Sequence, residues 1–347
     1  MKKNLFIGLF VIIAICNSAK AQYGYLRVAG GYSWNAFQKT GQVLTFLPGK
    51  NTDPAGSIIL PMFNADSVAG YRKNINDGYA RGGSLSLFGG YMINPYFGIE
   101  MGLTYLWGAS ISSESKIYND GLLGTMATLS SRTNSNGLSL MPGLYFRAAK
   151  PKSKIAPYAR VGLSLPVFGS TNHDIKIDAP HASLNIGLDV PVTSEISVST
   201  QSTVSLGVNG GVGISYTPIP ILSIFGEMNA QYLFVRPQLS KLTKYNLTVS
   251  GKETDMLPTT TKYSLETEFV DELTNSSNTT VFGNKERLYM NDPVAGQSYV
   301  DENKPRQELR QSANFSAIGF SIGIGVNLSK MIFKDPTGNK KKNSTSE

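Results

Sequence analysis

Five ionisable residues stand out because each lies in a stretch where oily residues alternate with small or polar ones. In each stretch the charged residue falls on the small-or-polar side of the alternation. The five are Arg27, Glu100, Arg147, Arg160 and Glu227. If these sides face one narrow space, the charges must pair, because burying an isolated ion costs several kcal/mol. We therefore predict an ion network that fills that space. A gate or narrow ion path is the alternative, and a catalytic pair of carboxylates is the least favoured interpretation.

Two histidines are the other candidates for chemistry. His173 and His181 lie eight residues apart, with Asp174 and Asp178 nearby. That spacing matches no common zinc-binding pattern, and histidines in loops are usually solvated. A lipid-modifying enzyme would need a Ser–His pair near the membrane surface, and no G-x-S-x-G motif accompanies His173. Gly207–Gly211 precedes no helix, which argues against phosphate binding. We expect no catalytic, cofactor-binding or metal site, and no enzyme activity.

The elements that position these residues are strands. Residues 97–108, FGIEMGLTYLWG, have one oily face and one face of mostly small or polar residues. A strand in a soluble protein is usually about 5–6 residues long, whereas a tilted membrane-spanning strand needs about 9–11. The pattern occurs eight times and predicts an all-β fold, an up-and-down antiparallel transmembrane β-barrel. The predicted strands are 24–34, 82–93, 96–108, 136–148, 155–168, 203–217, 221–235 and 314–328. Their inward positions are mostly Gly and Ser.

The connections between these strands alternate between short and long. Three are tight turns, at Asn94–Pro95, Lys150–Lys154 and Pro218–Pro220. The other four are long and polar, at 35–81, 109–135, 169–202 and 236–313. Outer-membrane barrels have short periplasmic turns at one rim and long extracellular loops at the other. The even number of strands then places both ends of the barrel in the periplasm.

Aromatic residues agree with this placement. Trp34 and Trp107, the two tryptophans, lie at loop-side strand ends, whereas Tyr91, Tyr96 and Tyr216 lie near turn-side ends. Amphipathic rings gather at both interfaces of a membrane. We predict that these five side chains form two interfacial girdles, with ordinary core aromatics as the alternative.

Two of the long connections contain further alternating segments. Counting 183–190 as a spanning strand would require one more partner strand, and a ten-stranded barrel is the alternative architecture. Tyr245–Val249 and Tyr263–Phe269 could form a hairpin that extends the seventh and eighth strands beyond the membrane. Their charged residues leave them without a full oily face. The connection 236–313 exceeds the usual length of a structureless loop, so it implies a function or added structure.

Composition supports a barrel rather than other classes. Charged residues make up only 16% of the chain, which has 35 glycines among 347 residues and a mean hydropathy of −0.11. These values exclude a highly charged disordered chain, a coiled coil and a helical membrane protein. The net charge of +8 is scattered, so nucleic-acid binding is not expected.

The two ends of the chain predict export. Residues 1–21 have the basic start, short apolar run and A-x-A site of a cleaved signal peptide. Cys16, the only cysteine, follows Ile15, and the large residue before it disfavours lipidation. We assign 22–333 to the barrel and 334–347 to a polar, basic periplasmic tail that includes Lys340–Lys342.

The signal, the eight alternating strands and the four long loops resemble the small outer-membrane β-barrel family typified by the OmpA and OmpX membrane domains. The form common in Bacteroidetes-type bacteria is the most similar. The resemblance covers about residues 22–333 and implies the outer membrane of a Gram-negative bacterium. It also implies contact with membrane lipid and lipopolysaccharide and with the barrel-assembly machinery. We expect a monomer without cofactors, whose loops bind an extracellular ligand. Only 14 residues follow Phe333, so no C-terminal peptidoglycan-binding domain and no terminal aromatic residue is expected.

These features lead to three hypotheses about function. The first is a structural anchor with a plugged lumen that displays its surface loops for interaction or adhesion. The second is a narrow, porin-like pore for ions or small solutes, whose conductance would change in Glu100→Ala or Arg147→Ala variants. The third and least favoured is a lipid-modifying enzyme that depends on His173.

Overall fold

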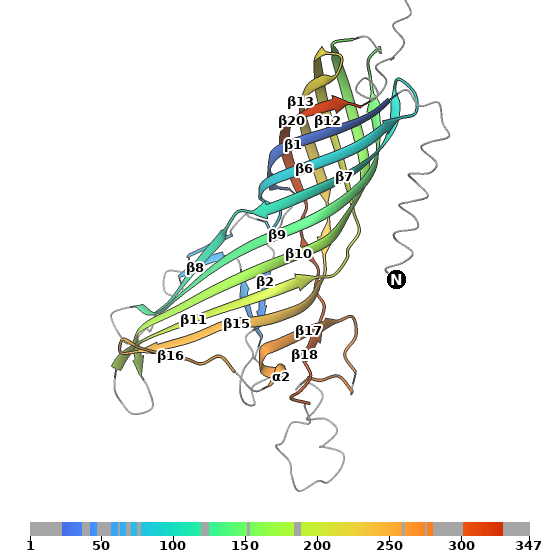
Figure 1. Cartoon of the computed structure of the whole chain (residues 1–347). Coiled ribbons are helices and arrows are strands. Elements are labelled where there is room, and N and C mark those ends of the chain that lie inside the picture. The colour runs from blue at the N-terminus through green and yellow to red at the C-terminus, as the bar shows by residue number, and fades with distance from the viewer. Residues whose placement is uncertain are drawn as a thin grey trace, which may run out of the picture.

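The computed structural model describes most of the chain (Figure 1). The described residues are 23–36, 42–46, 57–61, 63–66, 71–74, 78–118, 125–150, 153–183, 189–258, 261–274, 276–279 and 301–328. The predicted signal peptide, 1–21, and the predicted tail, 334–347, lie outside the described residues.

Eight antiparallel strands close into a ring, which confirms the predicted barrel and its strand number. β1 pairs with β20 on one side and with β6 on the other, and the pairing of β9 with β10 closes the circle. In order around the ring the strands are β1 (Tyr23–Asn35), β6 (Gly82–Met92), β7 (Phe97–Gly108), β9 (Thr125–Arg147), β10 (Ile155–Ser183), β12 (Gly207–Ile219), β13 (Leu222–Tyr232) and β20 (Ala317–Asn327).

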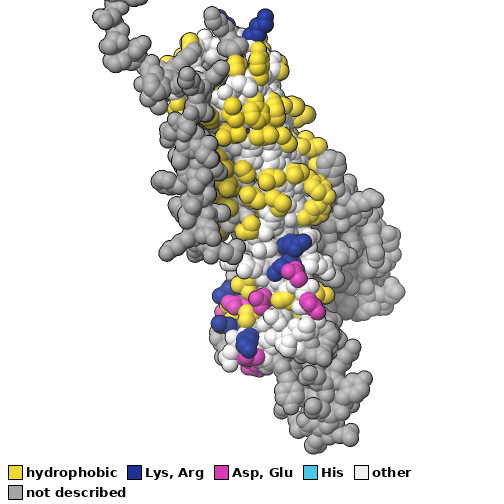
Figure 2. All heavy atoms as spheres, turned by 90° about the vertical axis from the view of Figure 1, so that its right-hand side faces the viewer, with side chains coloured by type: hydrophobic (Ala, Val, Ile, Leu, Met, Phe, Trp, Pro, Cys, Tyr) yellow, Lys and Arg dark blue, Asp and Glu magenta, His cyan; other side chains and the backbone are white. Residues whose placement is uncertain are grey.

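The two faces of the wall follow the alternation in the sequence. Arg27 of β1 is only 5% exposed, whereas its neighbours Leu26 and Val28 are 43% and 42% exposed. Figure 2 shows hydrophobic side chains as a broad band over the upper part of the molecule, with acidic and basic side chains gathered below it. An outward apolar band of this kind suits contact with lipid. The described chain contains no helix long and apolar enough to cross a membrane.

β9 and β10 are much longer than predicted, at 23 and 29 residues. The predicted segments 136–148 and 155–168 cover only their parts within the ring. Beyond the ring the alternation continues, but the apolar residues are now buried and the polar ones exposed. Ile175 is buried, whereas Asp174 and Lys176 are exposed. The predicted segments ended where the outward, lipid-facing apolar residues end. Outside the membrane the apolar face of an antiparallel sheet packs on a core instead, and its other face is solvated.

The extended ends of β9 and β10 form the centre of a second region, which we call the extramembrane sheet. β8 pairs with β9, β11 with β10, and β15 with β11, while β16 and β17 pair with β15 and β18 pairs with β17. The added strands are β8 (Ile111–Tyr118), β11 (Asp189–Ser202), β15 (Pro237–Val249), β16 (Lys252–Asp255), β17 (Glu266–Val270) and β18 (Arg306–Leu309). Figure 1 shows most of them in its lower half, below the barrel.

The predicted long loops therefore contain much regular structure. The remaining elements are β2 (Gln42–Phe46), β3 (Ser57–Pro61), β4 (Phe63–Asp66), β5 (Tyr71–Asn74), β14 (Phe234–Val235), α2 (Lys262–Leu265) and β19 (Ala313–Asn314). One face of the extramembrane sheet buries Ile175, Ile196, Val198 and Leu242, so this sheet has its own small core. Burial of that face gives it stability outside the membrane.

The ten-stranded alternative is wrong. Residues 189–190 begin β11, which pairs with β10 only over Ser170–Ser183, beyond the ring, and residues 184–188 lie outside the described part. Tyr245–Val249 and Tyr263–Phe269 do not form one hairpin with each other. The first ends β15 and pairs with β11 and β16, and the second spans α2 and β17. β15 lies beside β11 and forms hydrogen bonds with its backbone N–H and C=O groups, which would otherwise be an open sheet edge.

We predict that Leu87→Arg lowers the free energy of unfolding by about 2–4 kcal/mol, because an arginine that faces lipid near the midplane loses its hydration. Leu87 is outward-facing and lies beside Val28 and Leu103, in the middle of the wall. Urea unfolding from phospholipid vesicles, followed by tryptophan fluorescence, measures the change. Ser130→Arg, on the polar face of the extramembrane sheet, is the control and should change stability by less than about 0.5 kcal/mol. Equal losses in the two variants would contradict the assignment of the faces.

Candidate functional site

Two arginines and two glutamates from four strands meet inside the barrel. Arg160 Nε lies 2.7 Å from Glu227 Oε1, and Arg27 Nη2 lies 3.4 Å from Glu227 Oε2. Glu100 is more distant, at 3.8 Å from Arg27 and 4.0 Å from Arg160. The side chains of Glu100 and Glu227 are only 3% and 1% exposed. The four charges balance, as an enclosed ion cluster requires.

Two tyrosines complete the hydrogen bonds of the carboxylates. Tyr25 donates from its hydroxyl to Glu100 Oε2 at 3.0 Å, and Tyr158 donates to Glu227 Oε2 at 3.0 Å. Hydrogen bonds to charged groups are stronger than those between neutral groups, and they offset part of the cost of burying the charge.

The Arg27 guanidinium lies among four aromatic rings. Its central carbon is 4.5 Å from the ring centre of Phe225 and 5.0–5.3 Å from those of Tyr158, Tyr145 and Phe88. Its Nε and Nη1 atoms have no hydrogen-bond partner among the described residues. A cation within about 6 Å of a ring face is attracted by the ring, more strongly when both are desolvated. The aromatic rings thus replace the missing hydrogen bonds of Arg27 with electrostatic contacts.

Glycines on the neighbouring strands, each directly paired with an aromatic residue, make room for these large side chains. A Cβ atom at Gly102 would lie 2.5 Å from the Phe88 ring, and one at Gly213 would lie 2.6 Å from the Tyr158 ring. At Gly323 the Phe225 ring would be 2.6 Å away. An eight-stranded barrel leaves an interior just wide enough for side chains, so a ring that lies over the neighbouring strand needs a position without a side chain there. We call the four charged residues and their aromatic neighbours Tyr25, Phe88, Tyr145, Tyr158 and Phe225 the plug.

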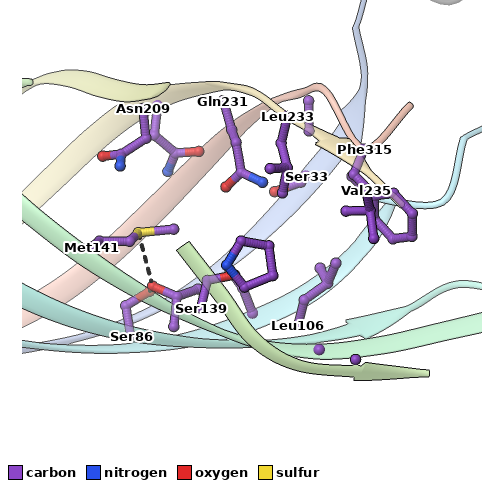
Figure 3. Close-up of a pocket in the computed structure, with 18 of the residues that line it drawn as sticks. Ser33, Ser86, Leu106, Ser139, Met141, Asn209, Gln231, Leu233, Val235 and Phe315 are labelled. Atoms are coloured by element: carbon purple, nitrogen blue, oxygen red, sulfur yellow. Dashed lines mark hydrogen bonds between the residues drawn. The ribbon is translucent and has the colours of Figure 1, made fainter. Parts of the chain in front are cut away.

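The plug divides the lumen into two spaces. On the turn side a vestibule of about 590 Å³ is lined by Arg27, Arg147 and Lys154. On the loop side lies a smaller cavity of about 100 Å³, shown in Figure 3. Arg160 is among its lining residues. Arg27 and Arg160 share Glu227, so the ion pairs lie on the boundary between the two spaces.

The cavity is covered on its loop side by an apolar cap, formed by Tyr79, Ala80, Leu233–Val235 and Ala313–Phe315. β14 and β19 pair there, and the Phe315 amide donates to the Leu233 carbonyl at 2.8 Å. The rings of Tyr79 and Phe315 stack with centres 5.2 Å apart. In Figure 3, Leu233, Val235 and Phe315 group together at one end, away from Met141 and Asn209. The lumen is thus obstructed at two levels.

The family model for the outer membrane protein beta-barrel domain matches residues 7–250. The chain belongs to this family. It is accordingly an outer-membrane protein of a Gram-negative bacterium, and the predicted resemblance is confirmed. No curated protein sequence matches the chain.

Solved structures of small outer-membrane barrels are similar to this barrel. Neisserial surface protein A matches with 13% identity and a TM-score of 0.28 over 87% of this chain and 96% of its own. Ail, the attachment invasion locus protein of Yersinia pestis, matches with 10% identity and a TM-score of 0.27 over 88% and 97%. Outer membrane protein W of E. coli matches with 13% identity and a TM-score of 0.27 over 89% and 99%.

Four of the five predicted lumen charges come together in this family member, and Arg147 lies nearer the turn side. Its Nη2 donates to the Ser153 carbonyl at 3.4 Å, near the turn between β9 and β10. The inward face was predicted correctly for Arg147, but its position close to the strand end places it in the vestibule.

The predicted inward face omitted the large residues of the plug. Tyr25, Phe88, Tyr145, Tyr158 and Phe225 share the inward parity of the charged residues, each two positions from a predicted inward residue. The same alternation that identified Arg27 could have identified Tyr25.

The predicted interfacial aromatics occupy the expected ends of their strands. Trp34 and Trp107 are 53% and 46% exposed near the loop-side ends of β1 and β7. Tyr96 and Tyr216 are 53% and 46% exposed at the turn side, and Tyr91 is half-buried. Their role as membrane girdles stays a prediction.

His173 is buried in the extramembrane sheet, not solvated as expected. It is 6% exposed, and its Nδ1 lies 3.0 Å from the Thr133 hydroxyl on β9. Burial lowers its pKa to about 4, although nearby Asp174 acts in the opposite direction. The structure shows no serine hydroxyl hydrogen-bonded to this ring among the described residues. Nor does any group of three or more His, Cys, Asp or Glu in the described part have the arrangement to hold a metal ion.

We predict that Glu227→Gln lowers the free energy of unfolding by about 3–5 kcal/mol, because it leaves Arg27 and Arg160 with one carboxylate between them. A second substitution, Arg160→Gln, restores neutrality and should recover part of the loss. Urea unfolding from phospholipid vesicles measures both.

The control for Glu227→Gln is Glu195→Gln, which removes an exposed partner of Lys244. This change should cost less than about 1 kcal/mol. If the buried and exposed substitutions cost the same, the plug does not depend on charge balance.

We predict that the extramembrane sheet weakens as the pH falls from about 6.5 towards 4. The unfolded chain binds a proton at His173 near pH 6.5, whereas the folded sheet does so only near pH 4. Between these values the unfolded state holds more protons, so stability decreases with falling pH. Amide hydrogen exchange of β10 and β11 at pH 7 and pH 5 measures the change. A His173→Asn variant should lose this part of the pH dependence, and an unchanged dependence would rule His173 out as its source.

Proposed function

We propose that the protein is a structural anchor that holds the extramembrane sheet at the cell surface for contact with an extracellular ligand. The observation that carries the proposal is the combination of an obstructed lumen with two wall strands that continue outward. The plug and the cap obstruct passage through the barrel. β9 and β10 each continue without a break from the barrel wall into the extramembrane sheet.

The exposed face of the extramembrane sheet supports contact with a polar ligand. One row of neighbours across five strands runs through Ser112, Arg132, Asp174, Ser197 and Lys244. A groove of about 600 Å³ lies along this face. Its charges alternate in sign, with Lys244 bound to Glu195 and Lys176 lying 3.1 Å from Asp178. Such a surface favours recognition by hydrogen bonds and charge pairing over hydrophobic docking.

The sheet is also fixed enough to present its side chains in one arrangement. Hydroxyl pairs bridge neighbouring strands, such as Ser113 with Ser131 at 2.5 Å and Thr200 with Ser240 at 2.6 Å. The Ser197 hydroxyl donates to Asp174 at 2.7 Å. A rigid surface loses less conformational entropy on binding than flexible loops would.

The proposal includes partners that follow from the setting of the barrel. The outward apolar band would contact membrane lipid and lipopolysaccharide, and the barrel-assembly machinery would insert the chain as a monomer. No catalytic role is assigned to His173, because its ring is enclosed within the sheet and bonded to Thr133.

We predict that host cells displaying the protein attach to at least one of immobilised heparin, chitosan or gelatin more than cells without it. The triple variant Arg132→Ser, Lys176→Ser, Lys244→Ser should reduce that attachment at least about tenfold, equivalent to about 1.4 kcal/mol. The matched control is Lys252→Ser, Lys262→Ser, Lys304→Ser, whose exposed lysines lie outside the groove.

Two results would contradict the anchor proposal. One is attachment that is the same in the groove variant and in its control. The other is steady ion conductance of the purified protein in planar bilayers that changes in Glu100→Ala or Arg147→Ala, which would favour the narrow pore instead.

A further inference from the structure

The loop-side cavity has features of a ligand site that surface display does not require. It lies between the plug and the cap and measures about 100 Å³. Cavities of about 150 Å³ accommodate benzene in other proteins. The occupant of this cavity would therefore be smaller than a benzene ring or of similar size.

Polar side chains from four strands line this space. The hydroxyls of Ser33, Ser84 and Ser139 and the amide of Gln231 line the cavity, and all four residues are half-buried. Hydroxyl and amide groups can both donate and accept hydrogen bonds, so they suit a polar group of a ligand. Apolar side chains line the same space, among them Leu106, Leu233 and Phe315 (Figure 3).

The cavity offers no unpaired charge. Arg160 is the charged residue among its described lining residues, and its Nε is bound to Glu227 at 2.7 Å. An anion would need to displace this partner or lose its hydration without compensation. The lining thus favours an uncharged occupant.

We infer that the loop-side cavity binds a small uncharged amphipathic molecule, such as a short alcohol or amide. Its polar group would bond to the serine hydroxyls and to Gln231, and its apolar part would face the cap residues.

The wall beside the cavity provides a route of access. β10 pairs with β12 up to Ser164 and with β11 from Ser170 onward, so residues 165–169 have no strand partner on that side. Opposite them, residues 203–206 are not in a strand, and Val204 and Leu206 are each 67% exposed. Pro166, Gly169 and Ser202 flank this interruption and also line the cavity. An amphipathic molecule would therefore enter from the membrane interface, past the interrupted wall.

Gly169 is a position at which this route could be narrowed. A Cβ atom there would be 3.6 Å from the Ser202 hydroxyl and 3.5 Å from the Asn136 carbonyl, which is ordinary contact. A larger side chain at residue 169 would thus extend towards Ser202, across the interruption. Gly30 is a matched control position, because a Cβ atom there meets nothing within 4 Å.

The experiment measures binding of trifluoroethanol at low millimolar concentration to the full protein in lipid nanodiscs by fluorine NMR. Trifluoroacetate, of nearly the same shape but anionic, is the comparison ligand. We expect trifluoroethanol to bind at least about tenfold more tightly than trifluoroacetate. No difference between the two ligands, or no binding of trifluoroethanol beyond empty nanodiscs, would overturn the inference.

Two variants, each with a matched control, test the location. Ser139→Leu fills the cavity and should weaken trifluoroethanol binding at least about tenfold, whereas Ser130→Leu outside the barrel should leave it unchanged. Gly169→Leu should slow exchange of the ligand, and Gly30→Leu should not. If Ser139→Leu does not form a barrel, the Gly169→Leu and Gly30→Leu pair decides. Unchanged binding in Ser139→Leu, or equal exchange in the two glycine variants, would place the ligand elsewhere.

Discussion

The interior of this barrel depends on the balance of two buried arginines against two buried glutamates. None of the four has a side chain more than 10% exposed. Each charge alone would destabilise the barrel by several kcal/mol, and only their arrangement around Glu227 makes burial tolerable. Because the four residues come from β1, β7, β10 and β13, the same contacts also fix the relative heights of strands on opposite sides of the ring.

The charge cluster determines where the barrel wall needs glycine. Large rings surround Arg27, and two of them lie against a glycine on the adjacent strand, Phe88 against Gly102 and Phe225 against Gly323. High glycine content is thus a consequence of a crowded lumen and not of a nearly empty one. The plug separates the vestibule on its turn side from the cavity on its loop side.

Much of the barrel could be predicted from the sequence, because alternation assigns each residue of a lipid-facing strand to one face. It identified Arg27, Glu100, Arg160 and Glu227 as inward. It could not show which inward residues share a height, so Arg147 was grouped with a network whose ion pairs lie deeper. The long ends of β9 and β10 escaped prediction because outside the membrane the oily face is buried in a sheet, and Ile175 and Ile196 meet only after β10 and β11 pair.

The two regions of the molecule constrain each other through the shared strands. Within the ring, β10 pairs with β9 and β12, but beyond Ser170 its second neighbour is β11. Two different neighbours cannot approach the same edge without a gap, so the change of partner leaves residues 165–169 without a strand on that side. Pro166 lies in this segment and has no backbone N–H to satisfy. Extending β10 into the extramembrane sheet therefore interrupts the barrel wall beside the cavity.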